Sequence, residues 1–338
     1  TMSLTGNATS DLETAAIKAE GTLSDLRIGQ PDLDRLLAGR TEFAVDATKD
    51  GMVIDLDGLR IENPQIVARG SGQYAPQSGR VEAELELSEL SQVVPELSGP
   101  ATVTLDATGA DGLWQVTLDG DGAGVTVAAE AELTDLDQPV KSVAGTAKLG
   151  VADLSGFSRL TGRELGGSLN LTLDGTATSD LSRADVTARG ALADLQLGQP
   201  DIDRLLRGVT ALDAQLRKSG QDIVLPRFEV TNPQITATGE GRYSPQNGQV
   251  TADVTLADLG EVLPELSGPG NVTLNAVGES GVWNVVLDGD GAGIALGADV
   301  EQVNVTGLDE GTFFADLILG ADGDELSISS RPSTAALP

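Results

Sequence analysis

VEAELEL, at residues 81–87, alternates apolar and acidic side chains without a break. Because successive side chains of a β-strand point to opposite faces of a sheet, this stretch predicts a strand with one apolar and one wet face. The same period-two pattern recurs in short runs separated by Gly, Asp, Asn and Pro. Such two-sided strands are typical of antiparallel sheets, so we expect an all-β chain built as an antiparallel meander.

The alternation gathers one set of apolar side chains on a common face of the predicted strands. In the first half of the chain these are Val81, Ala83, Leu85, Leu87, Val103, Leu105, Trp114, Val116, Leu118, Leu169, Leu171 and Leu173. In the second half they are Val250, Val254, Leu256, Val272, Leu274, Trp283, Val285 and Leu287. Such a face either packs into an ordinary sandwich core or lines an open groove. The residues alone favour the core, because most apolar strand faces are buried.

The sequence also contains an internal duplication. GQPDLDRLLAG at residues 29–39 recurs as GQPDIDRLLRG at 198–208, and PELSGP at 95–100 recurs at 264–269, each 169 positions later. The two tryptophans and the two tyrosines (Tyr74, Tyr243) follow the same offset. Since 338 residues are twice 169, we predict two modules, residues 1–169 and 170–338. No Pro-, Gly- or Ser-rich linker separates them, so we expect one continuous array.

Turn signals divide each module into hairpins. They are TKDG near Gly51, APQSG near Gly79, TGADG near Gly112 and DGDG at residues 119–122. The spacing predicts on the order of ten to twelve strands per module, and one sheet of that size would extend about 100 Å across its strands. An open twisted sheet that large must curl, fold over or close.

Helix is scarce. The best candidate is PDLDRLLAG at residues 31–39, with Pro31 suited to a first turn and Gly39 to a stop, and its copy spans 200–208. Single turns are expected at 90–97, 154–160 and 259–266. None of these is long enough to cover a sheet. The PDLDRLL helix is better suited to cap a sheet edge than to bind a partner.

Composition excludes several classes of function. The net charge is −31 and the pI near 4.1, so the chain would repel nucleic acids and anionic membrane surfaces. It has no cysteine and no histidine, which excludes disulfides, zinc thiolate sites and His-containing triads. No stretch approaches the ~20 apolar residues of a membrane span, so a membrane anchor is expected outside these residues. No cofactor is expected.

Asp119, Asp121, Asp288 and Asp290 are weak calcium candidates, because carboxylates on Gly-rich turns are hard oxygen ligands. A tight Asp-Gly hairpin is the simpler interpretation. Paired carboxylates could also suggest a glycosidase, but sugar sites need aromatic platforms, and aromatic residues make up 3% of the chain. We therefore expect no enzyme, and we expect both tryptophans to fill a core or groove.

The ordered set GQPDLDRLLAG, ENPQIVARGSGQY, PELSGP and DGDGAG, present twice, resembles the repeated periplasmic region of the TamB-type translocation and assembly module proteins, in the AsmA-like, bridge-type family. The resemblance covers essentially the whole chain. It implies an elongated sheet curled into an open apolar groove, β-taco-like, with two repeats and short helical turns. The apolar residues named above would then line that groove, and small aliphatic side chains suit acyl chains.

The resemblance further implies a periplasmic segment of a protein anchored in the inner membrane of a Gram-negative bacterium. Its function would be phospholipid transport between the inner and outer membranes and support of outer-membrane protein assembly. Its partners would be phospholipid acyl chains and, through regions outside this chain, a TamA-like outer-membrane barrel. The alternative is a structural or adhesive extracellular β-repeat protein with closed cores, stiffened by calcium.

Overall fold

The computed structural model describes residues 2–25, 27, 29, 31–95, 97–261, 267–280, 282–291 and 294–304. Within these residues each paired strand runs antiparallel to its neighbour and the helices are short, so the all-β prediction is confirmed. The chain divides into two compact units, Thr1–Gly198 (unit 1) and Gln199–Pro338 (unit 2). The division falls after Gly198, whereas a strand runs through position 169.

Unit 1 holds twelve strands. They are β1 (Met2–Ala8), β2 (Thr14–Ser24), β3 (Arg40–Asp50), β4 (Val53–Glu62), β5 (Ile66–Ala75), β6 (Ser78–Leu87), β7 (Ala101–Ala110), β8 (Leu113–Gly122), β9 (Val125–Thr134), β10 (Ser142–Val151), β11 (Gly166–Thr178) and β12 (Arg183–Gln196). Each pairs with the next along the chain, which makes one antiparallel meander.

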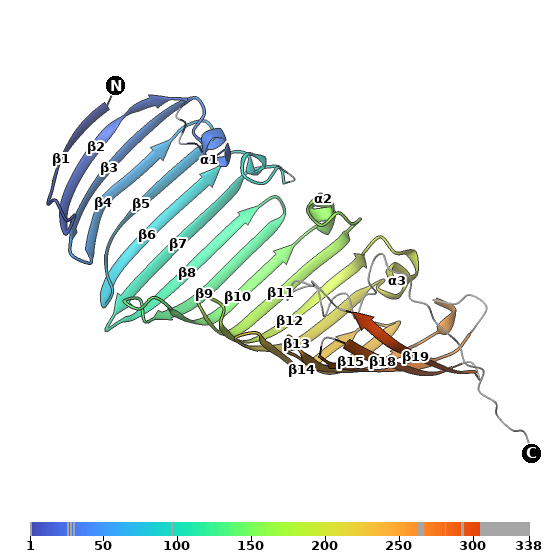
Figure 1. The fold of residues 1–338 in the computed structure, drawn as a ribbon. Helices are drawn as coiled ribbons and strands as arrows, with labels where there is room; N and C mark the ends of the chain where they lie inside the picture. Colours follow the sequence, from blue (N-terminus) through green and yellow to red (C-terminus); the bar gives the residue numbers. More distant parts are fainter. Residues whose placement is uncertain are drawn as a thin grey trace, which may run out of the picture. The chain divides into compact units, whose positions relative to one another are not determined.

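The helical turns of unit 1 lie at one margin of this sheet, here called the helical margin. They are α1 (Pro31–Leu36), η1 (Leu90–Gln92), η2 (Leu154–Phe157) and α2 (Ser158–Thr161). Figure 1 shows α1 and α2 beyond the strand ends, with the sheet face left open. The opposite margin, the hairpin margin, carries the turns from β1 to β2, β3 to β4, β5 to β6 and β7 to β8. The predicted helix and single turns of the first module are confirmed.

Among its described residues, unit 2 holds α3 (Pro200–Leu205), η3 (Leu259–Glu261) and seven strands. The strands are β13 (Val209–Ser219), β14 (Asp222–Thr231), β15 (Ile235–Tyr243), β16 (Asn247–Leu256), β17 (Gly270–Glu279), β18 (Val282–Gly291) and β19 (Ile294–Asn304), again a meander. The second PELSGP stretch and the predicted turn at 259–266 lie partly outside the described residues, as do residues 305–338 of the second predicted module.

Element boundaries recur at the sequence offset of 169. Strand β3 begins at Arg40 and β13 at Val209, and helices α1 and α3 begin at Pro31 and Pro200. The irregularities recur as well: the register between β4 and β5 shifts after Leu56, and that between β14 and β15 shifts after Leu225. A bulge bends its strand and strengthens the local twist. Strands β1–β4 arch strongly in Figure 1, whereas β6–β12 run straighter.

The NPQI motif joins the α1 segment to the sheet. The Asn63 side-chain amide donates to the Leu36 carbonyl at 2.7 Å and to Thr41 Oγ1 at 3.1 Å. Its carbonyl oxygen accepts from the backbone N–H groups of Gln65 at 2.8 Å and Ile66 at 2.9 Å. One side chain thus bonds to the end of α1, the start of β3 and the turn between β4 and β5.

The copy of this joint in unit 2 is buried. Asn232 is 6% exposed, and its amide donates to the Arg207 carbonyl at 3.0 Å and to Thr210 Oγ1 at 2.9 Å. Its carbonyl oxygen accepts from the Gln234 backbone N–H at 2.9 Å. The repetition of NPQI therefore has a structural cause in both units.

The two tryptophans cover glycines at strand ends. A Cβ built on Gly109 would lie 2.3 Å from the Trp114 ring, and one on Gly79 would lie 2.8 Å from it. Trp114 is 3% exposed, donates from Nε1 to the Pro76 carbonyl at 3.3 Å, and lies 5.4 Å from the Tyr74 ring, centroid to centroid. Trp283 covers Gly248 and Gly278 in the same way. Close approach of the ring requires glycine at these positions.

Candidate functional site

The strand register aligns apolar residues into continuous rows across all twelve strands of unit 1. The central row is Leu4, Ala19, Val45, Leu59, Gly70, Ala83, Leu105, Leu118, Ala129, Ala147, Leu173 and Ala188, each the registered partner of the next. Every member is aliphatic or glycine. A shift of one residue in the pairing of two strands would move the apolar side chains of one strand to the other face and interrupt the row.

Two further rows flank the central one on the same face. One is Met2, Gly21, Phe43, Ile61, Ala68, Leu85, Val103, Gly120, Val127, Leu149, Leu171 and Gly190. The other is Gly6, Ile17, Ala47, Leu56, Gly72, Val81, Ala107, Val116, Ala131, Gly145, Gly175 and Val186. We call these three rows the apolar band. None of its side chains is charged or forms hydrogen bonds.

The apolar band is long and narrow. Twelve strands spaced ~4.8 Å apart give it a length of about 50 Å, and three rows two residues apart give it a width of about 14 Å. Its surface is smooth in chemistry, because Ala, Val, Leu, Ile and Gly dominate and Phe43 is its one aromatic residue.

No second layer of unit 1 covers this band within the described residues. Elements contact their sheet neighbours and, at the helical margin, the short helical turns. Of the band residues only Ala19 and Ala107 are buried, and Leu105, Leu118 and Leu173 stay half-buried. A side chain inside a packed core is normally almost fully buried. The face is therefore apolar but open.

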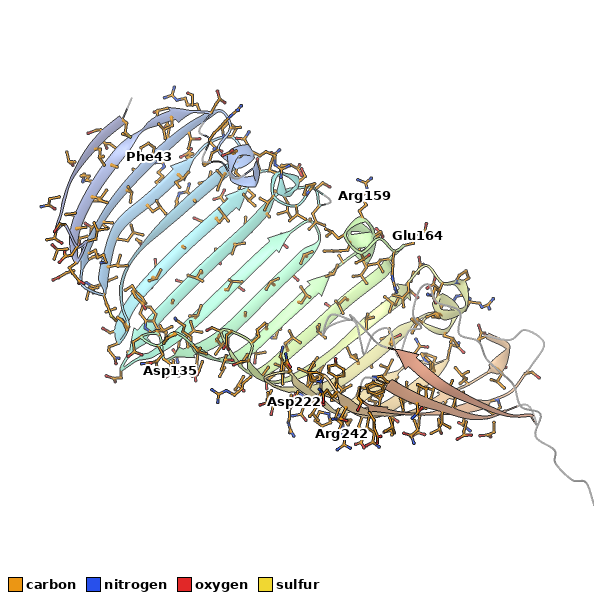
Figure 2. All side chains as sticks on the ribbon, viewed as in Figure 1. Phe43, Asp135, Arg159, Glu164, Asp222 and Arg242 are labelled. Atoms are coloured by element: carbon orange, nitrogen blue, oxygen red, sulfur yellow. The ribbon has the colours of Figure 1, made fainter. Side chains whose placement is uncertain are left out.

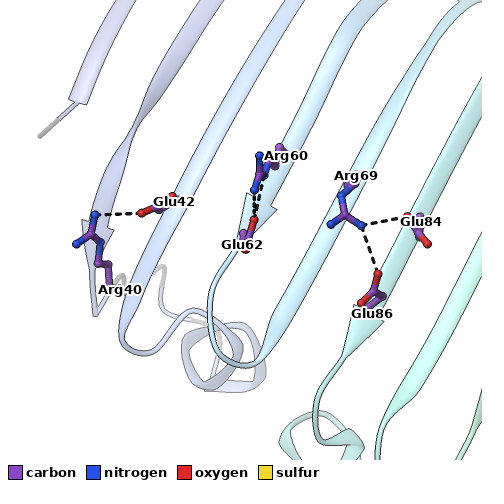
Figure 3. A network of polar contacts seen from close by, with 7 residues as sticks. All are labelled: Arg40, Glu42, Arg60, Glu62, Arg69, Glu84 and Glu86. Carbon is purple, nitrogen blue, oxygen red and sulfur yellow. Dashed lines mark hydrogen bonds and ion pairs between the residues drawn. The ribbon is translucent and has the colours of Figure 1, made fainter.

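The opposite face carries the charge. Arg69 lies 3.2 Å from Glu84 and 3.3 Å from Glu86 across the β5–β6 pair, and Lys18 lies 2.6 Å from Asp46 across β2–β3. Figure 3 shows the first of these clusters beside the pairs that Arg40 forms with Glu42 and Arg60 forms with Glu62. These groups are exposed, so each pair adds little stability. The main effect of these charged groups is to keep this face hydrated.

A hollow of about 730 Å³ lies on the wet face over β7–β12. Its lining includes Asp119, Asp121, Lys148 and Arg189, and the row Asp119, Ala128, Lys148, Thr172 and Arg189 crosses it in register. Five members of one row of the apolar band also border the hollow, namely Gly120, Val127, Leu149, Leu171 and Gly190; of these, the sequence predicted only Leu171 as a groove residue. Most residues that line the hollow, such as Thr104, Asp119 and Lys148, lie on the wet face.

The structure places the predicted apolar residues of the first half of the chain on one face. Val81, Leu85, Val103, Leu105, Val116, Leu118, Leu171 and Leu173 belong to the apolar band, together with Ala83. Leu87 and Leu169 lie on the same face toward the helical margin, and Trp114 lies at the hairpin margin. Figure 2 shows the two margins, with Asp135 at the hairpin margin and Arg159 at the helical margin.

The predicted residues of the second half also share one face, but several of them are packed. Val250 (2% exposed), Trp283 and Val285 form a buried cluster with Ala276, and Leu274 and Leu287 pack against it. Leu256 is buried as well, while Val254 and Val272 are half-buried. Unit 2 thus contains a small core where unit 1 has an open face.

Sequence reasoning missed the part of the band in β1–β5, including Ile17, Val45, Leu59 and Ile61, and the alanines of β9. In these strands glycine, alanine or a bulge interrupts the run of large apolar residues. A search for alternating residues that counts glycine and alanine as apolar would have found these strands of the band.

The predicted turn at residues 119–122 is wrong. Strand β8 continues to Gly122, and the turn is made by Ala123 and Gly124, with φ of 51° and 76°. Asp119 and Asp121 point to the wet face opposite Thr104 and Thr102, so Gly120 and Gly122 lie on the apolar face. A Cβ on Gly122 would lie 2.4 Å from the Ala101 side chain, so close packing rather than turn geometry requires glycine there.

The calcium candidates gain no support from their surroundings. The residues described contain no group of three or more carboxylates that could hold a metal ion. Asp288 and Asp290 occupy in β18 the positions that Asp119 and Asp121 occupy in β8, opposite Thr273 and Asn271. A Ca²⁺ site needs six to eight oxygen ligands, and alternate positions of one strand supply two carboxylates.

Comparison of the chain with protein families, with curated proteins and with solved structures finds no match. None of the described helices is both long and apolar enough to span a membrane.

Proposed function

We propose that this chain is a non-enzymatic segment of a TamB-like, AsmA-like protein, and that the apolar band of unit 1 holds phospholipid acyl chains in transit between the inner and outer membranes. The observation that carries the proposal is the open apolar band, three registered rows across twelve strands. An uncovered apolar surface of this size on a soluble chain is typical of a binding surface.

The chemistry of the band suits acyl chains better than shaped ligands. Burying about ten methylenes of one tail would contribute roughly 8 kcal/mol, at ~0.8 kcal/mol each. Each position along the band offers nearly the same aliphatic surface. A tail can therefore slide along it without meeting a deep free-energy minimum at any one strand. Head groups would stay in water at the margins of the band, and no covalent step is required.

The proposed setting is the periplasm of a Gram-negative bacterium, with the parent protein anchored in the inner membrane. There the segment would also support outer-membrane protein assembly, through a TamA-like barrel contacted by regions outside this chain. The wet face and the net charge of −31 keep the open sheet soluble.

A second candidate function is a structural or adhesive extracellular repeat with closed cores. The buried cluster around Trp283 favours it for unit 2, because Val250 and Ala276 are fully packed there. The half-buried Leu105 and Leu118 of unit 1 do not fit a closed core.

The experiment compares lipid occupancy of two matched variants. Leu105→Asp places a charge in the central row of the band, and Thr108→Asp places the same charge on the wet face of the same strand, beside Arg80. The protein is expressed in bacteria and purified without detergent, and bound lipid is extracted and counted by mass spectrometry.

We expect the parent and Thr108→Asp to carry phospholipid and Leu105→Asp to lose most of it. The circular dichroism spectra of all three should agree, because Leu105 is half-buried and a charge there can reach solvent. A lipid-free parent, or equal occupancy in both variants, would refute the proposal and favour closed cores.

A further inference from the structure

Lys49 is a charged side chain on the apolar face of unit 1. It stands two residues beyond Ala47 on β3, so both side chains leave the sheet on the same side. Its registered partners are Ala15 on β2 and Ile54 on β4, which continue the apolar face toward the hairpin margin. Among the registered strand positions of unit 1 that the structure describes, no other position on this face is charged.

The ammonium group of Lys49 lies where the apolar face meets water. Lys49 is half-buried, and its Nζ donates to the Leu12 carbonyl in the β1–β2 turn at 2.6 Å. Asp11 in the same turn is engaged elsewhere: hydrogen bonds from Thr9 and from the Glu13 backbone N–H lower the pKa of its carboxyl, and the charge of Lys49 adds to that shift. An ammonium has three donors, so two remain for an acceptor beside the band.

The internal duplication retains this lysine and replaces the strand cations of the wet face. Lys218 stands 169 positions after Lys49, opposite Ile223 as Lys49 stands opposite Ile54. The wet-face cations of β2–β6 have other counterparts, namely Thr187 for Lys18, Val209 for Arg40, Glu229 for Arg60, Thr238 for Arg69 and Gln249 for Arg80. A cation needed only for solubility would be free to vary in the same way.

A tyrosine follows the lysine in the same row in both units. Ile54 pairs with Tyr74, and Ile223 pairs with Tyr243. Tyrosine suits a boundary of this kind, because its ring is apolar and its hydroxyl is polar. At the helical margin, β3 instead presents Thr41 on this face, which is uncharged and 3% exposed. The two margins of the band therefore differ in chemistry, and the cation lies at the hairpin margin.

We propose that Lys49 binds the phosphate of a phospholipid whose acyl chains lie in the apolar band, so that head groups gather at the hairpin margin. This inference rests on the proposed function of the band. A phosphodiester carries one negative charge and accepts charge-assisted hydrogen bonds from an ammonium group. The long stem of the lysine packs along the apolar face while its charge stays in water. In a chain with a net charge of −31, one local cation gives an anionic phosphate a place to bind.

The test compares two fluorescent lipids with identical acyl chains, a phosphatidylglycerol and a diacylglycerol that lacks the phosphate. Their affinities are measured for the parent, Lys49→Gln and Lys18→Gln. Both substitutions remove one positive charge, and Lys18 lies on the wet face, 2.6 Å from Asp46. We expect the ratio of the two affinities to fall about five-fold in Lys49→Gln, because a partly exposed charged hydrogen bond to the phosphate is lost. The affinity for the diacylglycerol should stay the same, which also shows that the variant is folded.

Two further variants separate the lysine from the band. Lys49→Arg keeps the cation and should keep the ratio of the parent, whereas Leu105→Asp should weaken both lipids alike. An unchanged ratio in Lys49→Gln, or an equal fall in Lys18→Gln, overturns this inference and leaves the function of the band standing. A parent that binds neither lipid overturns the proposed function, and this inference with it.

Discussion

At the scale of single residues, the asparagine of NPQI illustrates why a motif can repeat without being a catalytic site. Asn232 needs both ends of its amide, since the nitrogen donates to Arg207 and Thr210 while the oxygen accepts from Gln234. An aspartate has the same shape but no donor. It would also place a carboxylate against the Arg207 carbonyl oxygen in a buried position.

We therefore expect Asn232→Asp to lower the free energy of unfolding of unit 2 by about 2–4 kcal/mol. The same change at the exposed Asn284, on the wet face of β18, should cost less than about 0.5 kcal/mol. Urea denaturation followed by Trp283 fluorescence measures both, in a background in which Trp114 is replaced by phenylalanine. Equal losses at the two positions would show that the amide network is not what stabilises this joint.

Leu181 is a residue in a conformation that suits it poorly. It lies at the β11–β12 turn with a φ of 53°, is 62% exposed, and its counterpart Leu12 has a φ of 57°. Asparagine tolerates this left-handed region better than leucine, so Leu181→Asn should stabilise unit 1 by about 0.5–1 kcal/mol. Leu160→Asn in α2, at an exposed leucine outside the left-handed region, should not stabilise. The urea midpoints of the two variants decide between relief of backbone strain and simple loss of an exposed apolar side chain.

At the scale of elements, the hairpin between β11 and β12 should respond to acid. Asp180 accepts from the Ser182 backbone N–H at 3.0 Å, and hydrogen bonds from Thr178 and Ser182 lower the pKa of its carboxyl from 3.8 to about 2. A carboxyl with a lowered pKa in the folded state stabilises above its unfolded pKa. That contribution is lost as the pH falls from about 4 toward 2.

We expect Asp180→Asn to remove this part of the acid sensitivity. The gap between the urea midpoints of the parent and Asp180→Asn should be largest at pH 5 and should close as the pH approaches 2. Asp185→Asn, which removes a carboxylate of β12 outside the turn, is the control. A gap that stays constant over this range would mean that the Asp180 carboxylate does not hold the turn.

Many strands and helices could be predicted from the sequence, because the alternation of apolar and polar residues and the glycines that end helices depend only on nearby residues. VEAELEL became β6, and PDLDRLLAG became α1 with its end near Gly39. The DGDG stretch could not be read in this way, since Gly122 is required by its close approach to Ala101 of β7. The rows of the apolar band likewise depend on the register between strands, which bulges such as that after Leu56 set in the pairing of β4 with β5.

At the scale of the whole molecule, the proposed lipid function would set the charge and the apolar band against each other at a membrane surface. The band would attract acyl chains, whereas a net charge of −31 repels an anionic lipid surface. The repulsion acts over the Debye length, which is ~30 Å at 0.01 M salt and ~8 Å at 0.15 M. Contact between the band and a bilayer is short-ranged. Salt should therefore change the rate at which the protein approaches the bilayer, but not its affinity for a lipid tail.

Transfer of a fluorescent phospholipid between vesicles tests this balance. With anionic donor vesicles, the rate should rise several-fold as salt increases from about 0.01 to 0.15 M, because shorter-ranged repulsion permits closer encounters. With zwitterionic donors the rate should stay nearly constant. Leu105→Asp should be slow under every condition, and Thr108→Asp should follow the parent. An equal dependence on salt with both kinds of vesicle would place the salt effect in the protein itself. The acidic wet face would then have no part in setting which membrane the band approaches.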